Sequence, residues 1–462
     1  MSAGHAAEGG RALVLGASMA GLAAAAALAG RFDRVTVLER DDLAGDARAR
    51  PGVPQGSHGH VLLPSGLRTL VELLPGIAGD LEASGAVLSD ATEMRFYLAE
   101  GPLRLVESGL GLVGATRPHL EGVVRRRVEA LPGVEVVAGH EVEGLVASPS
   151  GDRVEGVAVR APGSAASATM AADLVVDATG RASTSARWLT ELGYPAPEED
   201  RMHVGVHYAT RLFRRRPGDL GGCSHVVVAV PPGGRRGGFA VAVEGGRWLV
   251  TVMGHLGERP PTDLEGFGAY AASLTHDDLG TLVARAEPAS EAASGGFPAY
   301  RRRRYDRLAR LPGGWAVVGD ALCSLNPAYA MGMSTALAQA VLLGEAVERR
   351  GPERAGAAFL RASRRVLDPA WDLATGSDLA HPEMDGPRPV SWRILNAYLQ
   401  RLLPRATVDP VLARAAMEVM TLVAPPPSVL RPGIAWRALR PRRRPTHPAP
   451  DPVARPSSAA HH

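Results

Sequence analysis

Lysine is missing from this sequence, so all 51 residues counted as Lys or Arg are arginines. Every mechanism that requires a catalytic lysine is therefore excluded. Cysteine is almost missing as well: Cys223 and Cys323 are the only two, and they match no metal-binding Cys/His spacing. Two cysteines cannot build a disulfide framework, which favours a reducing cytoplasm. We expect neither a metal site nor structural disulfides.

The sequence also lacks the segments that direct a chain into or across a membrane. Its first ten residues have no basic region, so the apolar run behind them is not a signal peptide. That run is interrupted by Gly16 and Ser18 and is too short to span a bilayer. A basic, apolar stretch at 411–439 could lie on a membrane surface, but its prolines favour packed helices. We therefore expect a cytoplasmic protein without a membrane partner.

An excess of one charge sign is absent too. The formal net charge is +3 at pH 7, which implies no general attraction to nucleic acid. Arginine does cluster locally, and we interpret each cluster as solvated surface rather than a phosphate site. These clusters lie at 125–127, 214–216, 301–304 and 442–444.

The most informative stretch that is present runs from Arg11 to Arg40. An apolar run at 12–15 predicts a buried parallel strand, and an Ala/Leu-rich run ending at Leu28 predicts a helix. The turn GASMAG at 16–21 joins them, and a second apolar strand at 35–38 follows. This order is typical of a βαβ dinucleotide-binding unit.

Individual positions of this unit have physical roles. Gly16 permits the tight turn, and Gly21 lets the helix pack closely on the strand. The helix N-terminus offers N–H groups and a positive dipole end to a pyrophosphate. Glu39 follows the second strand, where a carboxylate can accept hydrogen bonds from a ribose diol. Ser18 replaces the usual middle glycine, but its small side chain still lets a phosphate approach.

Two glycine-rich segments each allow more than one interpretation. The stretch at 16–21 could be an ordinary turn before an Ala-rich core helix, but strand, glycines, helix, strand and terminal acid together favour nucleotide binding. The stretch GLGLVG at 109–114 has no clean apolar strand before it, so we expect a loop there.

The remaining pattern predicts a discontinuous nucleotide-binding domain with a β-rich domain inserted in it. Alternating segments predict strands at 94–98 and 103–106, and a small-residue segment at 161–171 predicts a loop. The pattern returns to a parallel strand at 315–318, before a helix at 334–349. The expected domains are 9–184 (nucleotide-binding, first part, with small inserted strands at about 90–107), 185–300 (β-rich substrate domain), 301–350 (nucleotide-binding, second part), 351–440 (C-terminal helices) and 441–462 (disordered tail).

Four sequence blocks and one helical segment carry a family resemblance. They are GASMAG with VLER, the loop RPGVPQGSHGH, the strand DLVVDATG, the block VVGDALCSLNPAYAMGM and the segment at 368–375. Together they resemble the FAD-dependent monooxygenases of the aromatic-hydroxylase superfamily, which share a glutathione-reductase-like FAD domain. Within it, the chain most resembles the flavin epoxidases of polyether natural-product biosynthesis. The resemblance spans about residues 11–440.

The resemblance implies an α/β fold and an FAD site. The fold would be a Rossmann-like FAD-binding domain with an inserted antiparallel substrate sheet and a C-terminal helical region. The implied roles are ribose binding by Glu39, diphosphate binding by Arg117 and ribityl binding by Asp320, although Asp320 could instead cap a helix. The full implied set is Gly16, Ala17, Ser18, Met19, Ala20, Gly21, Glu39, Arg40, Arg50, Gln55, Arg117, Val142, Asp320, Pro327, Gly332 and Met333. Relatives commonly have Gly-Gln-Gly or Gly-His-Gly at 330–332, where this chain has Ala-Met-Gly.

The resemblance also implies an activity. FAD would form a C4a-hydroperoxide with O2 and pass one oxygen atom to a hydrophobic polyketide, terpenoid or polyene, and we expect epoxidation of an alkene. Aromatic hydroxylation, or reduction of prenyl double bonds by a flavin reductase or dehydrogenase, are alternatives. Only one strong dinucleotide fingerprint is present, so NAD(P)H would visit transiently, or a flavin reductase or synthase partner would assist.

No side chain is predicted with certainty to be catalytic. His58, Tyr329 and Met331 are candidates near the flavin, but His58 could simply hydrogen-bond within its loop, and Tyr329 could simply pack. A flavin halogenase is disfavoured, because that family relies on a lysine and on a W-x-W-x-I-P block that this chain lacks. A non-enzymatic nucleotide-binding or docking protein is a further alternative.

Overall fold

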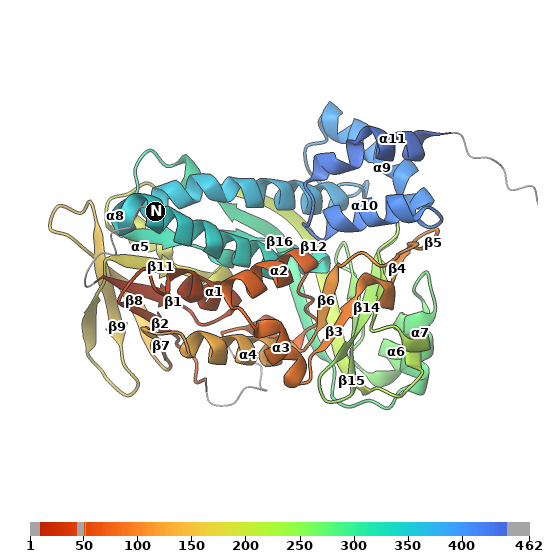
Figure 1. Ribbon diagram of the computed structural model, residues 1–462, viewed down its shortest axis with the longest axis horizontal. Coiled ribbons are helices and arrows are strands. Elements are labelled where there is room, and N and C mark those ends of the chain that lie inside the picture. Colours follow the sequence, from red (N-terminus) through yellow and green to blue (C-terminus); the bar gives the residue numbers. More distant parts are fainter. Residues whose placement is uncertain (1–9, 44–49, 51, 441–462) are drawn as a thin grey trace, which may run out of the picture.

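Figure 1 shows the computed structural model of the chain, which describes residues 10–43, 50 and 52–440. The fold class predicted from the sequence is confirmed: a parallel-sheet α/β domain, a large and mostly antiparallel sheet, and a group of C-terminal helices. The predicted tail at 441–462 and the side chain of Gln55 lie outside the described residues.

The first domain is built on a five-stranded parallel sheet. Its order is β17-β11-β1-β2-β7, so the strand that comes last of these five in the sequence, β17, pairs with β11. The central strands are apolar almost throughout because other elements bury them: helix α1 (Met19–Leu28) packs on β1, β2 and β11, and strand β9 (Val154–Arg160) packs on β11. The strands are β1 (Arg11–Leu15), β2 (Arg34–Leu38), β7 (Val134–Val137), β11 (Leu174–Asp177) and β17 (Trp315–Val317).

A sheet of eight strands forms the second layer. Its order is β18-β16-β12-β15-β14-β13-β4-β5, and only the β13–β4 pair is parallel. Helices α6 (Leu264–Ala272) and α7 (Asp278–Arg285) share an apolar core with it. The strands are β4 (Met94–Leu98), β5 (Gly101–Pro102), β12 (Glu199–Arg214), β13 (His225–Val228), β14 (Arg236–Val243), β15 (Arg247–Gly254), β16 (Ala293–Arg303) and β18 (Cys323–Ser324).

Two small sheets correct two sequence predictions. The segment at 109–114 is not all loop, since β6 (Gly111–Gly114) pairs with β3 (Val87–Asp90). The segment at 161–171 also ends in a strand, β10 (Ser167–Ala171), which pairs with β9 (Val154–Arg160). Beside β9 lies β8 (Glu141–Ala147). Neither of these two strands has the apolar alternation that marks a strand in sequence. Each is extended because it pairs with a neighbouring strand.

The predicted strand at 103–106 is wrong. The backbone N–H of Arg104 donates to the carbonyl of Ala406, in the C-terminal helices, rather than to another strand. Leu103 is buried in the apolar cluster that these helices form with β4 and β6. The alternation in this segment therefore reflects packing under helices.

The longest helix, α8 (Met331–Asp378), has two arms that lie side by side in Figure 1. Gly351 interrupts it with φ 71° and ψ 164°, so the predicted helix at 334–349 is most of the first arm. That arm packs on α1 (Met19–Leu28), and the second arm packs on β17. The other helices are α2 (Pro64–Leu73), α3 (Ile77–Ala83), α4 (Arg117–Glu129), α5 (Ser185–Glu191), α9 (Val390–Ala406), α10 (Pro410–Met420) and α11 (Pro432–Leu439).

The C-terminal helices α9, α10 and α11 are grouped at one end of the molecule, next to β4 and β5 (Figure 1). Across residues 10–43, 50 and 52–440, none of the helices has the length and apolar character needed to cross a membrane.

Candidate cofactor site

The turn between β1 and α1 can be made only with glycine at two positions. Gly16 has φ +100°, and a Cβ atom there would lie 2.8 Å from the carbonyl oxygen of Ala178. A Cβ atom on Gly21 would lie 1.8 Å from the carbonyl oxygen of Gly16. These close approaches place the N-terminus of α1 at the carboxyl edge of the sheet, between β1 and β11.

A carboxylate lies at this helix N-terminus. Glu121, in α4, accepts hydrogen bonds through Oε1 from Ser18 Oγ at 2.6 Å and Met19 N at 3.4 Å. The same oxygen accepts from Arg117 Nε at 2.6 Å, and Oε2 accepts from Arg50 Nη2 at 2.9 Å. The positive end of α1 and two guanidinium groups thus converge on one anion.

Glu121 was not among the residues singled out from the sequence, although its spacing from Arg117 gave a signal. The two are four residues apart and therefore share one face of α4. Burial alone would raise the pKa of Glu121, but the charges of Arg117 and Arg50 outweigh it and lower this pKa to about 2. Glu121 is therefore an anion at any physiological pH.

Glu39 and Arg50 complete this cluster. Glu39 Oε2 accepts from Ala17 N at 2.9 Å and from Arg50 Nη1 at 3.0 Å. Its other oxygen accepts from Asp41 N at 3.0 Å. The structure therefore brings together Ala17, Ser18, Glu39, Arg50 and Arg117, all of which the sequence analysis assigned to the cofactor.

The donors in this cluster suit a dinucleotide diphosphate. Ser18 Oγ, the Met19 N–H, Arg50 and Arg117 all point at one carboxylate, which has the same hydrogen-bonding chemistry as a phosphate oxygen pair. Glu39 directly follows β2, the position at which dinucleotide-binding folds carry an acid that bonds to a ribose hydroxyl.

A second group of predicted residues lies at the carboxyl end of β17. Gly319 has φ +63°, and a Cβ atom there would meet Ala20 Cβ at 2.6 Å. A Cβ atom on Gly332 would lie 3.8 Å from Asp320 Oδ1. Burial raises the pKa of Asp320, and the charges of Arg117 and Arg181 oppose this rise. Asp320 therefore lies between the first turn of α1 and the start of α8.

These positions follow the carboxyl edge of the parallel sheet. Glu39 follows β2, the turn at 16–21 follows β1, and Asp320 follows β17, with β11 between β1 and β17. Ligands of open α/β sheets bind outside the carboxyl ends of the strands. A dinucleotide with its ribose at Glu39 and its diphosphate at α1 would therefore run along this edge in the direction of Asp320.

The other predicted binding residues are more scattered. Arg40 is exposed and approaches Asp41 at 4.0 Å. Val142 lies in β8, whose start adjoins Glu39 because His140 N donates to the carbonyl of Glu39 at 2.8 Å. Pro327 begins a short 3-10 helix, η7 (Pro327–Tyr329), and Met333 is buried in the first turn of α8.

The three candidate catalytic residues have different surroundings. His58 is buried edge-on against Tyr208, with ring centroids 4.6 Å apart, and its Nδ1 lies 3.3 Å from Thr210 Oγ1. Burial lowers the pKa of His58 to about 4, so it is a weak base at neutral pH. Tyr329 donates a hydrogen bond to Asp378 at 2.6 Å. Met331 is buried as the first residue of α8.

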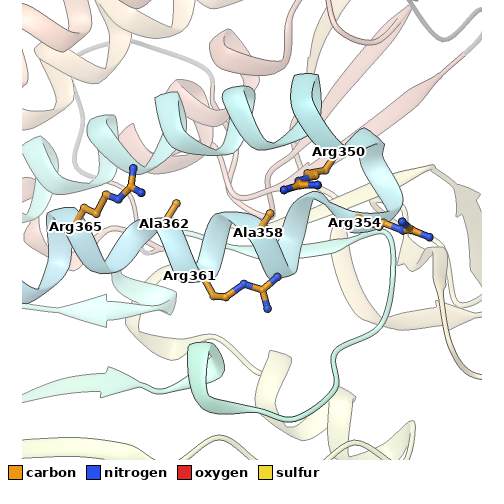
Figure 2. Close-up of a pocket in the computed structure, with 6 residues that line it drawn as sticks. All are labelled: Arg350, Arg354, Ala358, Arg361, Ala362 and Arg365. Atoms are coloured by element: carbon orange, nitrogen blue, oxygen red, sulfur yellow. The ribbon is translucent and has the colours of Figure 1, made fainter.

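A hollow of about 480 Å³ lies elsewhere, beside the second arm of α8 (Figure 2). Arginine side chains surround it, and two alanines form part of its wall. Its lining residues are Arg350, Arg354, Ala358, Arg361, Ala362 and Arg365, none of which belongs to the predicted cofactor set. Within the described part of the chain, no group of three or more His, Cys, Asp or Glu side chains is arranged to hold a metal ion.

Solved structures of three proteins share this fold at low sequence identity. A flavoprotein/dehydrogenase from Cytophaga hutchinsonii has a TM-score of 0.65 at 17% identity and covers 90% of this chain and 93% of its own. The p-nitrophenol 4-monooxygenase PnpA from Pseudomonas putida DLL-E4 has a TM-score of 0.60 at 19% identity, covering 89% and 98%. PqsL from Pseudomonas aeruginosa, described as a probable FAD-dependent monooxygenase, has a TM-score of 0.60 at 17% identity, covering 80% and 97%.

A relative is found at higher identity. No family model matches the chain. Protein Rv3254 of Mycobacterium tuberculosis (strain ATCC 25618 / H37Rv) is 34% identical over 420 residues, which span 87% of this chain and 87% of the relative. The chain therefore belongs to the same family as Protein Rv3254 and has the fold of the FAD-dependent monooxygenases.

Proposed function

We propose that the protein binds FAD and acts as a monooxygenase that adds one oxygen atom from O2 to a hydrophobic natural-product intermediate. The observation that carries this proposal is the row of polar groups along the carboxyl edge of the parallel sheet, from Glu39 through the α1 N-terminus to Asp320. Its order and chemistry suit ribose, diphosphate and ribityl groups in turn. The fold shared with PqsL and PnpA supports it.

The chain's own residues would hold and orient the cofactor. Arg117, Arg50 and the α1 N-terminus bind the diphosphate, Glu39 accepts from the ribose, and Asp320 accepts from a ribityl hydroxyl. The N-terminus of α8 points its positive dipole end at the far end of the cofactor, where it stabilises negative charge. When bound, FAD supplies the redox and dioxygen chemistry.

Epoxidation of an alkene is the reaction we propose first, because it requires no general base. The histidine candidate, His58, has its pKa lowered to about 4 by burial, and its Nδ1 contacts Thr210 Oγ1. Electrons would come from NAD(P)H bound transiently or from a flavin reductase partner. Aromatic hydroxylation of a polyketide remains the second candidate, since PnpA, which shares the fold, is a p-nitrophenol 4-monooxygenase.

Mass spectrometry under 18O2 tests this function. The FAD-loaded protein is supplied with NAD(P)H, with and without a flavin reductase, and with a panel of hydrophobic polyenes and phenols. We expect one 18O atom in an epoxide of a polyene. An 18O atom on a phenol ring instead supports hydroxylation. Anaerobic saturation of a double bond, with no 18O uptake under 18O2, would contradict monooxygenation and support a reductase or dehydrogenase.

A further inference from the structure

A buried carboxylate connects the two ends of α8. Asp378, the last residue of this helix, is 0% exposed. Its Oδ1 accepts from Tyr329 Oη at 2.6 Å. Its Oδ2 accepts from Tyr300 Oη at 2.5 Å and from Asn326 Nδ2 at 3.1 Å. Tyr329 and Asn326 belong to the loop before α8, whereas Tyr300 belongs to β16.

This loop, residues 326–330, has a conformation that its sequence does not favour. Ala330 has φ 54° and ψ 20°, a left-handed backbone that glycine adopts far more readily than alanine. Asn326 Oδ1 accepts from Ala328 N at 3.1 Å while its Nδ2 donates to Asp378. Asn326 thus stabilises the turn through a hydrogen bond within the loop, and Asp378 stabilises it through hydrogen bonds from the end of α8.

The position of the loop follows from the sheet edge. Asp320 precedes it and Gly332 follows it, and a Cβ atom on Gly332 would lie 3.8 Å from Asp320 Oδ1. If the ribose and diphosphate of FAD bind at Glu39 and α1, as the proposed function requires, the ring system extends beyond Asp320 toward this loop. The backbone of 326–330, which joins Asp320 to the start of α8, would then lie beside the flavin ring.

Resting on the proposed function, we propose that Asp378 is a positioning residue, which fixes the loop 326–330 against the flavin ring through its bonds to Tyr329 and Asn326. A buried carboxylate offers enough lone pairs for all three donors. Burial, followed by the charge of Asp378, raises the pKa of both Tyr300 and Tyr329, so both remain protonated donors. Asp378 touches no reacting group and acts only through the loop.

Two tyrosines bonded to the same carboxylate provide a matched pair of variants. Tyr329→Phe removes the bond that ties the loop, and Tyr300→Phe removes a bond of similar length that ties the large sheet. The measurements are the visible absorption spectrum of bound FAD, its dissociation constant and the urea midpoint. We expect Tyr329→Phe to shift the flavin bands and weaken FAD binding about tenfold, the effect of one lost hydrogen bond to a charged group. Tyr300→Phe should lower the urea midpoint but leave the flavin bands unchanged.

Asp378→Asn is the second test, because an amide keeps the size of the side chain but offers one acceptor oxygen instead of two. It should shift the flavin bands at least as far as Tyr329→Phe. If Asp378→Asn does not fold, the comparison of Tyr329→Phe with Tyr300→Phe still tests the positioning role. Identical flavin spectra for the wild type, Tyr329→Phe and Tyr300→Phe would overturn the positioning role while leaving FAD binding intact. A wild-type protein that cannot be loaded with FAD would overturn both this role and the proposed function.

Discussion

Glu121 lies with its charge enclosed between Arg117 and Arg50, and it is 6% exposed. Its pKa is lowered from 4.5 to about 2 in the folded chain. Because the folded pKa is the lower one, Glu121 stabilises the fold above pH 4.5, and this contribution is lost as the pH falls from 4.5 toward 2. A shift of this size corresponds to about 3 kcal/mol.

Glu121→Gln removes this charge and leaves two arginines without their shared partner. We expect the free energy of unfolding at pH 7 to fall by about 3–5 kcal/mol, as for a broken buried ion pair. Urea unfolding at pH 7 and pH 3 measures it, and the variant should lose less stability than the wild type between these two values. Glu135→Gln, on an exposed position of β7, is the control. Equal decreases in the free energy of unfolding at pH 7 for Glu121→Gln and Glu135→Gln would contradict the account.

His225 also makes the protein less stable in acid, but over a higher range of pH. Burial lowers its pKa to about 4, from 6.5. Between pH 6.5 and pH 4 His225 is therefore protonated in the unfolded chain but neutral in the folded chain. The free energy of unfolding consequently decreases as the pH is lowered through this range. The slope attributable to this histidine is about 1.4 kcal/mol per pH unit near pH 5. His225→Gln should flatten the measured pH dependence by that amount, and an unchanged slope would show that His225 titrates normally.

At the scale of elements, α8 begins after a residue with an unfavourable backbone. Ala330→Gly should stabilise the protein by about 1 kcal/mol, because glycine adopts φ 54° without a clash. Ala328→Gly, two residues earlier within η7, should be destabilising, since no left-handed backbone exists there to relieve. Thermal unfolding of both variants gives the comparison. A lower melting temperature for Ala330→Gly would show that the turn is not strained.

The joint between the two arms of α8 depends on glycine. Gly351 has φ 71° and ψ 164°, a region that other residues rarely enter, and no atom lies within 4 Å of a Cβ built there. Gly351→Ala should therefore cost about 1–3 kcal/mol through the backbone alone. Gly433→Ala, also in open space but with helical backbone in α11, should gain up to about 1 kcal/mol. Urea midpoints that move in the same direction in both variants would contradict this reasoning.

Elements with a strong apolar pattern were predictable, and those made by pairing were not. The apolar runs predicted β1, α1 and β2 correctly because nearly every residue of each element is buried. In contrast, β6 contains two glycines, and Gly114 is required because a Cβ atom there would lie 2.0 Å from the carbonyl oxygen of Ala242. Such a contact arises between segments more than a hundred residues apart, and local sequence does not reveal it.

At the scale of the whole molecule, contacts between distant segments also determine the large sheet and the candidate site, and local sequence does not reveal them. The pairing of Met94–Leu98 with β13 joins strands from opposite sides of β11 in the sequence. The dinucleotide motif singled out Ser18 and Glu39 because their spacing is local, and the family resemblance implied Arg117. Glu121 and Asp378 were missed, because their importance lies in partners that only the folded chain brings together.

Equilibrium titration of the protein with FAD tests the central claim most directly. We expect saturable binding of one FAD per chain, with quenched flavin fluorescence and visible absorption bands that differ from those of free FAD. Arg117→Met, which removes a donor aimed at the diphosphate position, should weaken this binding about tenfold, the effect of one charged hydrogen bond. Failure of the folded wild-type protein to bind FAD at any concentration tested would contradict the account.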